Sequence, residues 1–70
     1  MAVIEAPMAG KILEINVAVG DTIAEDDEIM VVEAMKMENP IYATAGGTIK
    51  EIKVKVGDQI AEGQELMVVE

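Results

Sequence analysis

The chain contains two copies of one pattern, and this internal repeat limits the folds that are open to it. The segment from Gly10 to Glu33 aligns with the segment from Gly47 to Glu70 at a constant offset of 37 residues and without a gap, and sixteen of the twenty-four aligned positions are identical. Two further matches upstream extend the copies to residues 4–33 and 41–70. Two copies are too few for a solenoid, in which a repeat needs neighbours on both sides. We therefore expect two halves related by a pseudo-twofold axis, each covering the open face of the other.

Each copy has the residue pattern of β-structure. Hydrophobic and polar residues alternate over residues 13–19 and 52–56, which is typical of strands with one buried face. A break in this alternation after Ile12 and after Ile49 predicts a β-bulge in each copy. Glycine–aspartate pairs then predict a turn, followed by a short strand at Ile23 or Ile60, a second turn at 26–27 or 63–64, and strands at 29–32 and 66–69.

No segment has a helical periodicity, so the sequence predicts an all-β fold. Four short strands in each half give about eight in all. We expect a flattened barrel or sandwich of two four-stranded antiparallel sheets with pseudo-twofold symmetry. At this length, residues 1–70 form at most one domain.

The composition argues against several classes of function. The chain has no cysteine and no histidine, which removes disulfides, thiolate chemistry, the usual zinc ligands and the commonest general base. A net charge of −9 argues against binding to nucleic acid or to an anionic membrane. The first residues do not resemble a signal peptide, and the longest purely aliphatic run, 29–32, is too short to span a bilayer. We expect a soluble, cytoplasmic domain that does not insert into membranes.

The repeat leaves residues 34–40, "AMKMENP", as the connection between the two halves. If the halves are related by a twofold axis, this connection projects at the end opposite the two termini. Pairing 30–34 with 37–41 leaves Met35 and Lys36 as a two-residue loop, although such loops favour Asn or Gly. A turn centred on 38–40 would satisfy local preferences better. We favour Met35 and Lys36 at the tip, because a departure from local rules is typical of a functional site.

The lysine at this tip has an ordinary interpretation as well as a functional one. Most lysines are solvated surface residues, and most methionines beside a lysine fill a hydrophobic core. Met35 and Met37, however, both lie in the connection, where a core position is hard to give to both. Exposed flexible apolar groups around an amine are features that a modifying enzyme could bind.

The segment "EAMKMENP", residues 33–40, resembles the attachment motif of biotinyl domains, the carrier modules of biotin-dependent carboxylases and decarboxylases. The motif of that family is Ala/Ser-Met-Lys-Met. The resemblance extends over the whole chain, since "APMAGKI" is similar to the first hairpin of the family and residues 19–70 continue to its usual end. The resemblance implies the biotinyl/lipoyl hammerhead fold. Residues 19–29 and 56–66 are equal in length, so the chain resembles the class without an inserted thumb.

The resemblance also implies roles for individual residues. Lys36 would carry biotin through an amide on its side-chain nitrogen. Met35 and Met37 would be determinants read by biotin protein ligase, with Ala34 and Glu33 as weaker contributors. The loaded chain would move carboxyl groups between a biotin carboxylase and a carboxyltransferase or decarboxylase subunit, as a non-catalytic carrier. The acceptor substrate stays open.

Two other functions stand beside the biotin carrier. The first is a lipoyl carrier of a 2-oxo acid dehydrogenase, a class with the same fold but with an Asp-Lys-Ala triplet; here Met35 and Met37 replace the acid and the alanine. The second is a β-barrel adaptor without any modification.

Three remaining features have structural interpretations. We expect residues 26–28, "DDE", to form a solvated turn and not a metal site, because the spacing lacks an EF-hand loop. Lys50, Lys53 and Lys55 are expected on a solvent-facing strand edge, where they would discourage pairing; docking of a carboxylase partner is the alternative. Pro40 fits an edge strand or a bulge, since it cannot donate a ladder hydrogen bond.

Overall fold

The computed structural model describes all residues, 1–70, and contains eight strands and no helix. The strands are β1 (Ala2–Glu5), β2 (Gly10–Ile15), β3 (Thr22–Ile23), β4 (Glu28–Ala34), β5 (Met37–Tyr42), β6 (Gly47–Ile52), β7 (Gln59–Ile60) and β8 (Glu65–Val69). The predicted all-β class is confirmed. No element is a helix of the length and hydrophobicity that crossing a bilayer requires.

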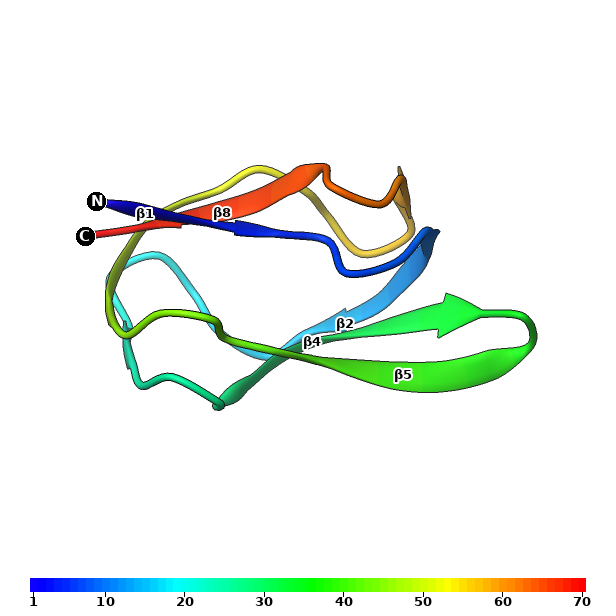
Figure 1. Ribbon diagram of the computed structural model, residues 1–70, viewed down its shortest axis with the longest axis horizontal. Helices are drawn as coiled ribbons and strands as arrows, with labels where there is room; N and C mark the ends of the chain where they lie inside the picture. Colours follow the sequence, from blue (N-terminus) through cyan, green and yellow to red (C-terminus); the bar gives the residue numbers. More distant parts are fainter.

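The strands form two four-stranded antiparallel sheets, with the orders β1-β8-β6-β3 and β5-β4-β2-β7. Each sheet has two central strands from one half of the chain and two edge strands from the other half. Neither half therefore completes a sheet alone. Figure 1 shows both termini at one end of the elongated molecule and the β4–β5 hairpin at the opposite end, as the repeat predicted.

The two halves repeat the same pairings at the offset of 37. Ile12 lies opposite Val32 between β2 and β4, and Ile49 lies opposite Val69 between β6 and β8. The register shifts directly after Ile12 and directly after Ile49, so the bulges predicted from the broken alternation are confirmed.

The core is aliphatic and uses the same positions of both halves. Fifteen buried residues form one cluster, in which most members occur as repeat pairs, such as Ile4 with Ile41 and Ile12 with Ile49. Met30 and Met67 form one of these pairs, and both are fully buried. Burial of each such side chain contributes about 1.5–3 kcal/mol to folding, which explains how a small chain without disulfides holds two sheets together.

The acidic residues of the loops stabilise turns. Asp21 Oδ2 accepts a hydrogen bond from the backbone N–H of Ala18, and Asp58 Oδ2 does the same for Lys55. At the second turn, Asp27 Oδ2 accepts from Ala24 N–H at 2.9 Å. Carboxylates of this kind substitute for a backbone partner in a turn. Asp27 thus has a structural role in its own loop.

Two expectations from the sequence are wrong. The alternating runs do not continue as strands to residues 19 and 56, because β2 ends at Ile15 and β6 at Ile52. Beyond these ends the chain leaves the sheet and turns, so Val19 and Val56 are each 61% exposed. The strand edge predicted for Lys50, Lys53 and Lys55 is not found either. Strand β6 lies between β8 and β3 and contains only Lys50, while Lys53 and Lys55 follow its end. Pro40, in contrast, lies in the edge strand β5 as predicted.

Candidate functional site

The connection between the halves is a tight hairpin with a two-residue loop. Strand β4 ends at Ala34, strand β5 begins at Met37, and these two residues pair directly. Met35 and Lys36 are the loop itself. The predicted register is confirmed, and the alternative turn at 38–40 is wrong, because those residues pair with β4 within strand β5.

The backbone at the tip is strained. Met35 has φ of 53° and Lys36 has φ of 65°, both in the left-handed region that two-residue hairpin loops use. A residue with a Cβ atom in this region costs about 1–2 kcal/mol relative to glycine. The hairpin keeps two long side chains where Asn-Gly would be more stable, which is the pattern expected when side-chain function outweighs local stability.

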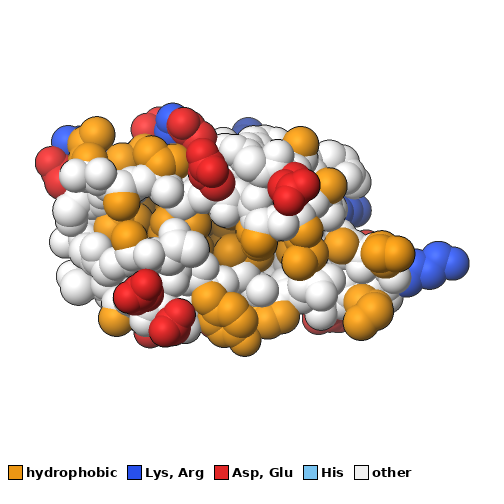
Figure 2. All heavy atoms as spheres, viewed as in Figure 1, with side chains coloured by type: hydrophobic (Ala, Val, Ile, Leu, Met, Phe, Trp, Pro, Cys, Tyr) orange, Lys and Arg blue, Asp and Glu red, His pale blue; other side chains and the backbone are white.

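The two methionines of the tip differ from those of the core. Met35 is 94% exposed and Met37 is 64% exposed, whereas Met30 and Met67 are fully buried. Met35 and Met37 therefore do not fill a core. In Figure 2, the end of the molecule that carries the β4–β5 hairpin has a basic side chain projecting past hydrophobic side chains.

The lysine between these methionines is exposed and forms no ion pair. Glu33 and Glu38 lie opposite each other on the hairpin strands just below it. The Asn39 side chain donates to the carbonyl oxygen of Met37 at 3.0 Å, which supports the β5 side of the tip. Lys36 thus presents an amine in solvent on a short, well-defined arm of the fold.

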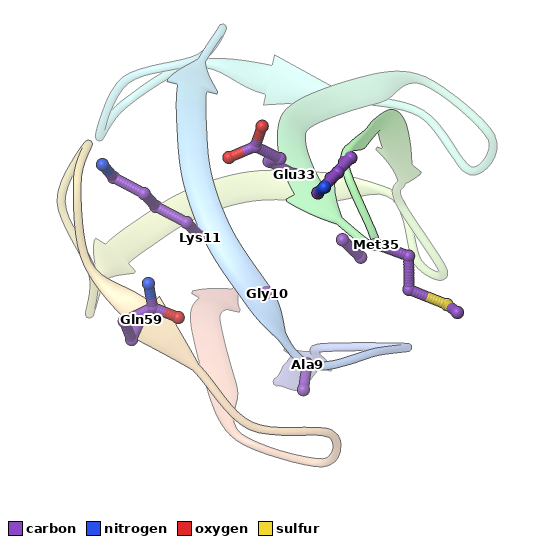
Figure 3. Close-up of a pocket in the computed structure, with 8 residues that line it drawn as sticks. Ala9, Gly10, Lys11, Glu33, Met35 and Gln59 are labelled. Atoms are coloured by element: carbon purple, nitrogen blue, oxygen red, sulfur yellow. The ribbon is translucent and has the colours of Figure 1, made fainter.

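A groove with a volume of about 410 Å³ begins beside this lysine. Its lining residues come from the hairpin, from β2 and the residue before it, and from β7, which pairs with β2: Ala9, Gly10, Lys11, Glu33, Ala34, Met35, Lys36 and Gln59. In Figure 3, Lys11 and Gln59 lie on the same side of the groove and Met35 points away from them.

Sequence reasoning did not identify Gly10, Lys11 or Gln59 as site residues. They are separated from the motif by more than twenty residues in either direction, and only the pairing of β2 with β4 and with β7 brings them to the hairpin. The repeat nevertheless marked two of them as positions where the copies differ. The residues equivalent to Lys11 and Gln59 in the other half are Thr48 and Thr22.

Comparison with known proteins identifies the family of the chain. The model of the biotin/lipoyl family, described as "Biotin-requiring enzyme", matches residues 2–69. The biotin carboxyl carrier protein of Streptococcus mutans is 58% identical over 38 residues, which are 54% of this chain and 29% of that protein. The gamma subunit of glutaconyl-CoA decarboxylase from Acidaminococcus fermentans is 50% identical over 38 residues, which are 54% of this chain and 26% of that subunit. The chain thus spans less than a third of the length of these relatives.

A solved structure shares the whole fold. The urea carboxylase of Kluyveromyces lactis superposes with a TM-score of 0.88 and 29% sequence identity, over 97% of this chain and 6% of that enzyme. These relatives are named for biotin or for carboxylation and decarboxylation, and none of the three is named for lipoate, so the lipoyl alternative is less favoured. With a family model matched along nearly its full length, the chain belongs to the biotin/lipoyl attachment family, the family of biotin-requiring enzymes.

Proposed function

We propose that residues 1–70 act as a single carrier domain that holds biotin on Lys36 and passes carboxyl groups between two active sites. The observation that carries this proposal is the exposed, unpaired amine of Lys36 on a two-residue hairpin loop between two exposed methionines. The names of the relatives in the biotin/lipoyl family support biotin as the attached group. A chain without histidine or cysteine supports a carrier that is not itself catalytic.

Attachment of biotin requires an accessible amine, and Lys36 provides one at the tip of the hairpin. The neutral amine of Lys36 attacks the carbonyl carbon of biotinyl-adenylate, a carbon–nitrogen bond forms, the bond to the phosphate oxygen breaks, and AMP leaves while the nitrogen loses a proton. The proposal assigns this reaction to a biotin protein ligase that reads the neighbours of the lysine. Met35 and Met37 would supply flexible apolar contacts, and Ala34 and Glu33 would contribute less.

The resulting amide removes the charge of the lysine and lengthens its arm, while the barrel stays rigid. A carrier of this kind serves a biotin carboxylase and a carboxyltransferase or decarboxylase subunit. Two of the relatives support such partners, one being a carboxylase and the other a decarboxylase subunit by name. The cytoplasmic location expected from the sequence belongs to the same proposal.

Intact-mass analysis after co-expression with a biotin protein ligase tests the proposal. The wild-type chain is expected to gain the mass of one biotinyl group, and Lys36→Arg is expected to gain none. Lys11→Arg serves as the matched control, because Lys11 is the other lysine that lines the groove and is also exposed. Capture of Lys36→Arg by streptavidin, or loading by a lipoate ligase in preference to biotin, would refute the assignment.

A further inference from the structure

The groove beside Lys36 is lined by exposed polar side chains, among them Lys11 and Gln59. It has a volume of about 410 Å³ and is open to solvent. The lysine at which we propose attachment forms part of its wall. A group carried on that lysine therefore starts at the mouth of the groove.

The internal repeat shows which residues sheet formation itself requires, because the same strand pairing occurs twice in the molecule. Lys11 and Gln59 pair with each other between β2 and β7, and the equivalent pair between β6 and β3 is Thr48 with Thr22. The backbone pairing is the same at both ends of the molecule. The long polar side chains occur only at the end that carries the hairpin, so sheet formation does not account for them.

Neither of these side chains has a partner within the chain. Lys50 and Lys53 form ion pairs at 3.2 and 2.7 Å, but Lys11 forms none, although it lies directly opposite Glu33 in the sheet. The carboxamide of Gln59 makes no hydrogen bond within 3.5 Å, whereas that of Gln64 accepts one from Ala61 N–H. The groove thus offers an ammonium donor and a carboxamide, which both donates and accepts.

We propose that this groove binds the ureido ring of biotin when biotin is attached to Lys36, an inference that rests on the proposed function. The ammonium of Lys11 would donate to the ureido carbonyl oxygen, a charge-assisted hydrogen bond. The carboxamide of Gln59 would accept from a ureido N–H. A short tether gives an effective concentration on the order of 1 mM, so a dissociation constant of about 1 mM leaves the groove occupied about half of the time.

Nuclear magnetic resonance of the full chain tests this inference. Intact mass first establishes one biotin on Lys36, and ¹H–¹⁵N spectra are then compared before and after loading. Resonances of Lys11 and of the Gln59 side-chain amide are expected to shift, while those of Thr48 and Thr22 stay in place. A nuclear Overhauser effect is expected between a ureido proton and the Gln59 side chain.

Variants taken from the repeat separate binding from folding. Lys11→Thr and Gln59→Thr introduce the residue that the equivalent position already has, and each is expected to reduce the groove shifts by more than half. Thr48→Lys and Thr22→Gln at the far end are expected to leave those shifts unchanged. Shifts confined to residues 35–37 in the loaded wild type, or groove shifts that persist in both threonine variants, would overturn the inference. A chain that takes no biotin on Lys36 would overturn the proposed function as well.

Discussion

Gly10 packs directly against the backbone of Glu33, a residue of β4 near the tip of the β4–β5 hairpin. A Cβ atom at Gly10 would overlap the carbonyl oxygen of Glu33 and would lie 2.7 Å from Cγ2 of Val32. Strand β2 can therefore lie this close to β4 only because position 10 has no side chain. The base of the hairpin that carries Lys36 depends on this contact.

Gly10→Ala is expected to lower the free energy of unfolding by about 2 kcal/mol, because backbone atoms of β4 must move to admit the new methyl group. Urea denaturation measures this change. Gly57→Ala is the control, since its φ of 95° is unfavourable for alanine but no atom lies within 4 Å of the added Cβ. The control is expected to lose about 1 kcal/mol. Equal losses in the two variants would show that the contact with Glu33 is not limiting.

Met35→Asn is expected to stabilise the chain and to impair its modification. Asparagine adopts the left-handed conformation more readily than methionine, so the free energy of unfolding should rise by about 1 kcal/mol. For a domain of this size, that gain corresponds to a rise of about 4–8 °C in the melting temperature. The rate of biotin loading, followed by mass, should fall because a side chain proposed to contact the ligase is lost.

Met37→Asn is the matched control for the opposite effects of Met35→Asn on stability and on biotin loading. Met37 lies in strand β5 and does not have a positive φ, so asparagine relieves no backbone strain at this position. Asparagine also fits a strand less well than methionine. It should lower both the stability and the loading rate. Unchanged loading in both asparagine variants would contradict the proposed role of the methionines.

Asp26→Gly is expected to stabilise the protein by about 1 kcal/mol. Asp26 has φ of 76° and its repeat equivalent is Gly63, with φ of 85°, so the same left-handed turn contains glycine in one half and aspartate in the other. Gly63→Asp should produce the opposite change of similar size. Calorimetric melting temperatures measure both variants, and a loss of stability in Asp26→Gly would indicate that the carboxylate contributes more than the backbone strain costs.

The pair Lys53–Glu65 makes stability depend on pH at the alkaline end. A hydrogen bond to Glu65 at 2.7 Å, together with the charge of that carboxylate, raises the pKa of Lys53 above its ordinary value of 10.5. A raised pKa in the folded state stabilises the protein below the unfolded pKa, and this contribution disappears as the pH rises through the folded pKa. The stability advantage of the wild type over Lys53→Met should therefore persist to about pH 10 and vanish above it.

The repeat supplies the control for this titration. Asn16 and Glu28 are the equivalents of Lys53 and Glu65, and their side chains lie 3.4 Å apart without a titrating amine. Urea denaturation of Asn16→Ala should show a difference from the wild type that does not change between pH 8 and pH 11, values chosen to bracket the ordinary lysine pKa of roughly 10.4. A parallel pH dependence in both variants would point to global alkaline unfolding and away from the Lys53–Glu65 pair.

Much of the fold could be predicted from the sequence, because the repeat and the alternation of hydrophobic and polar residues are visible in the order of the residues alone. The duplicated pattern indicated two halves, the break after Ile12 and Ile49 indicated the bulges, and the leftover segment indicated the hairpin. Strand ends were predicted less well. Val19 has the right residue type for a strand, but the turn that follows removes it from the sheet and exposes it.

The sequence by itself determined the all-β class, the twofold repeat and the position of Lys36 between two methionines in the connecting segment. Only the tertiary structure decided which strands neighbour one another, because hydrogen bonds between strands from different halves depend on long-range packing and not on local pattern. The pairing of β2 with β7, a strand from the other half, adds Gln59 to the sheet of the hairpin and so completes the lining of the groove next to the amine.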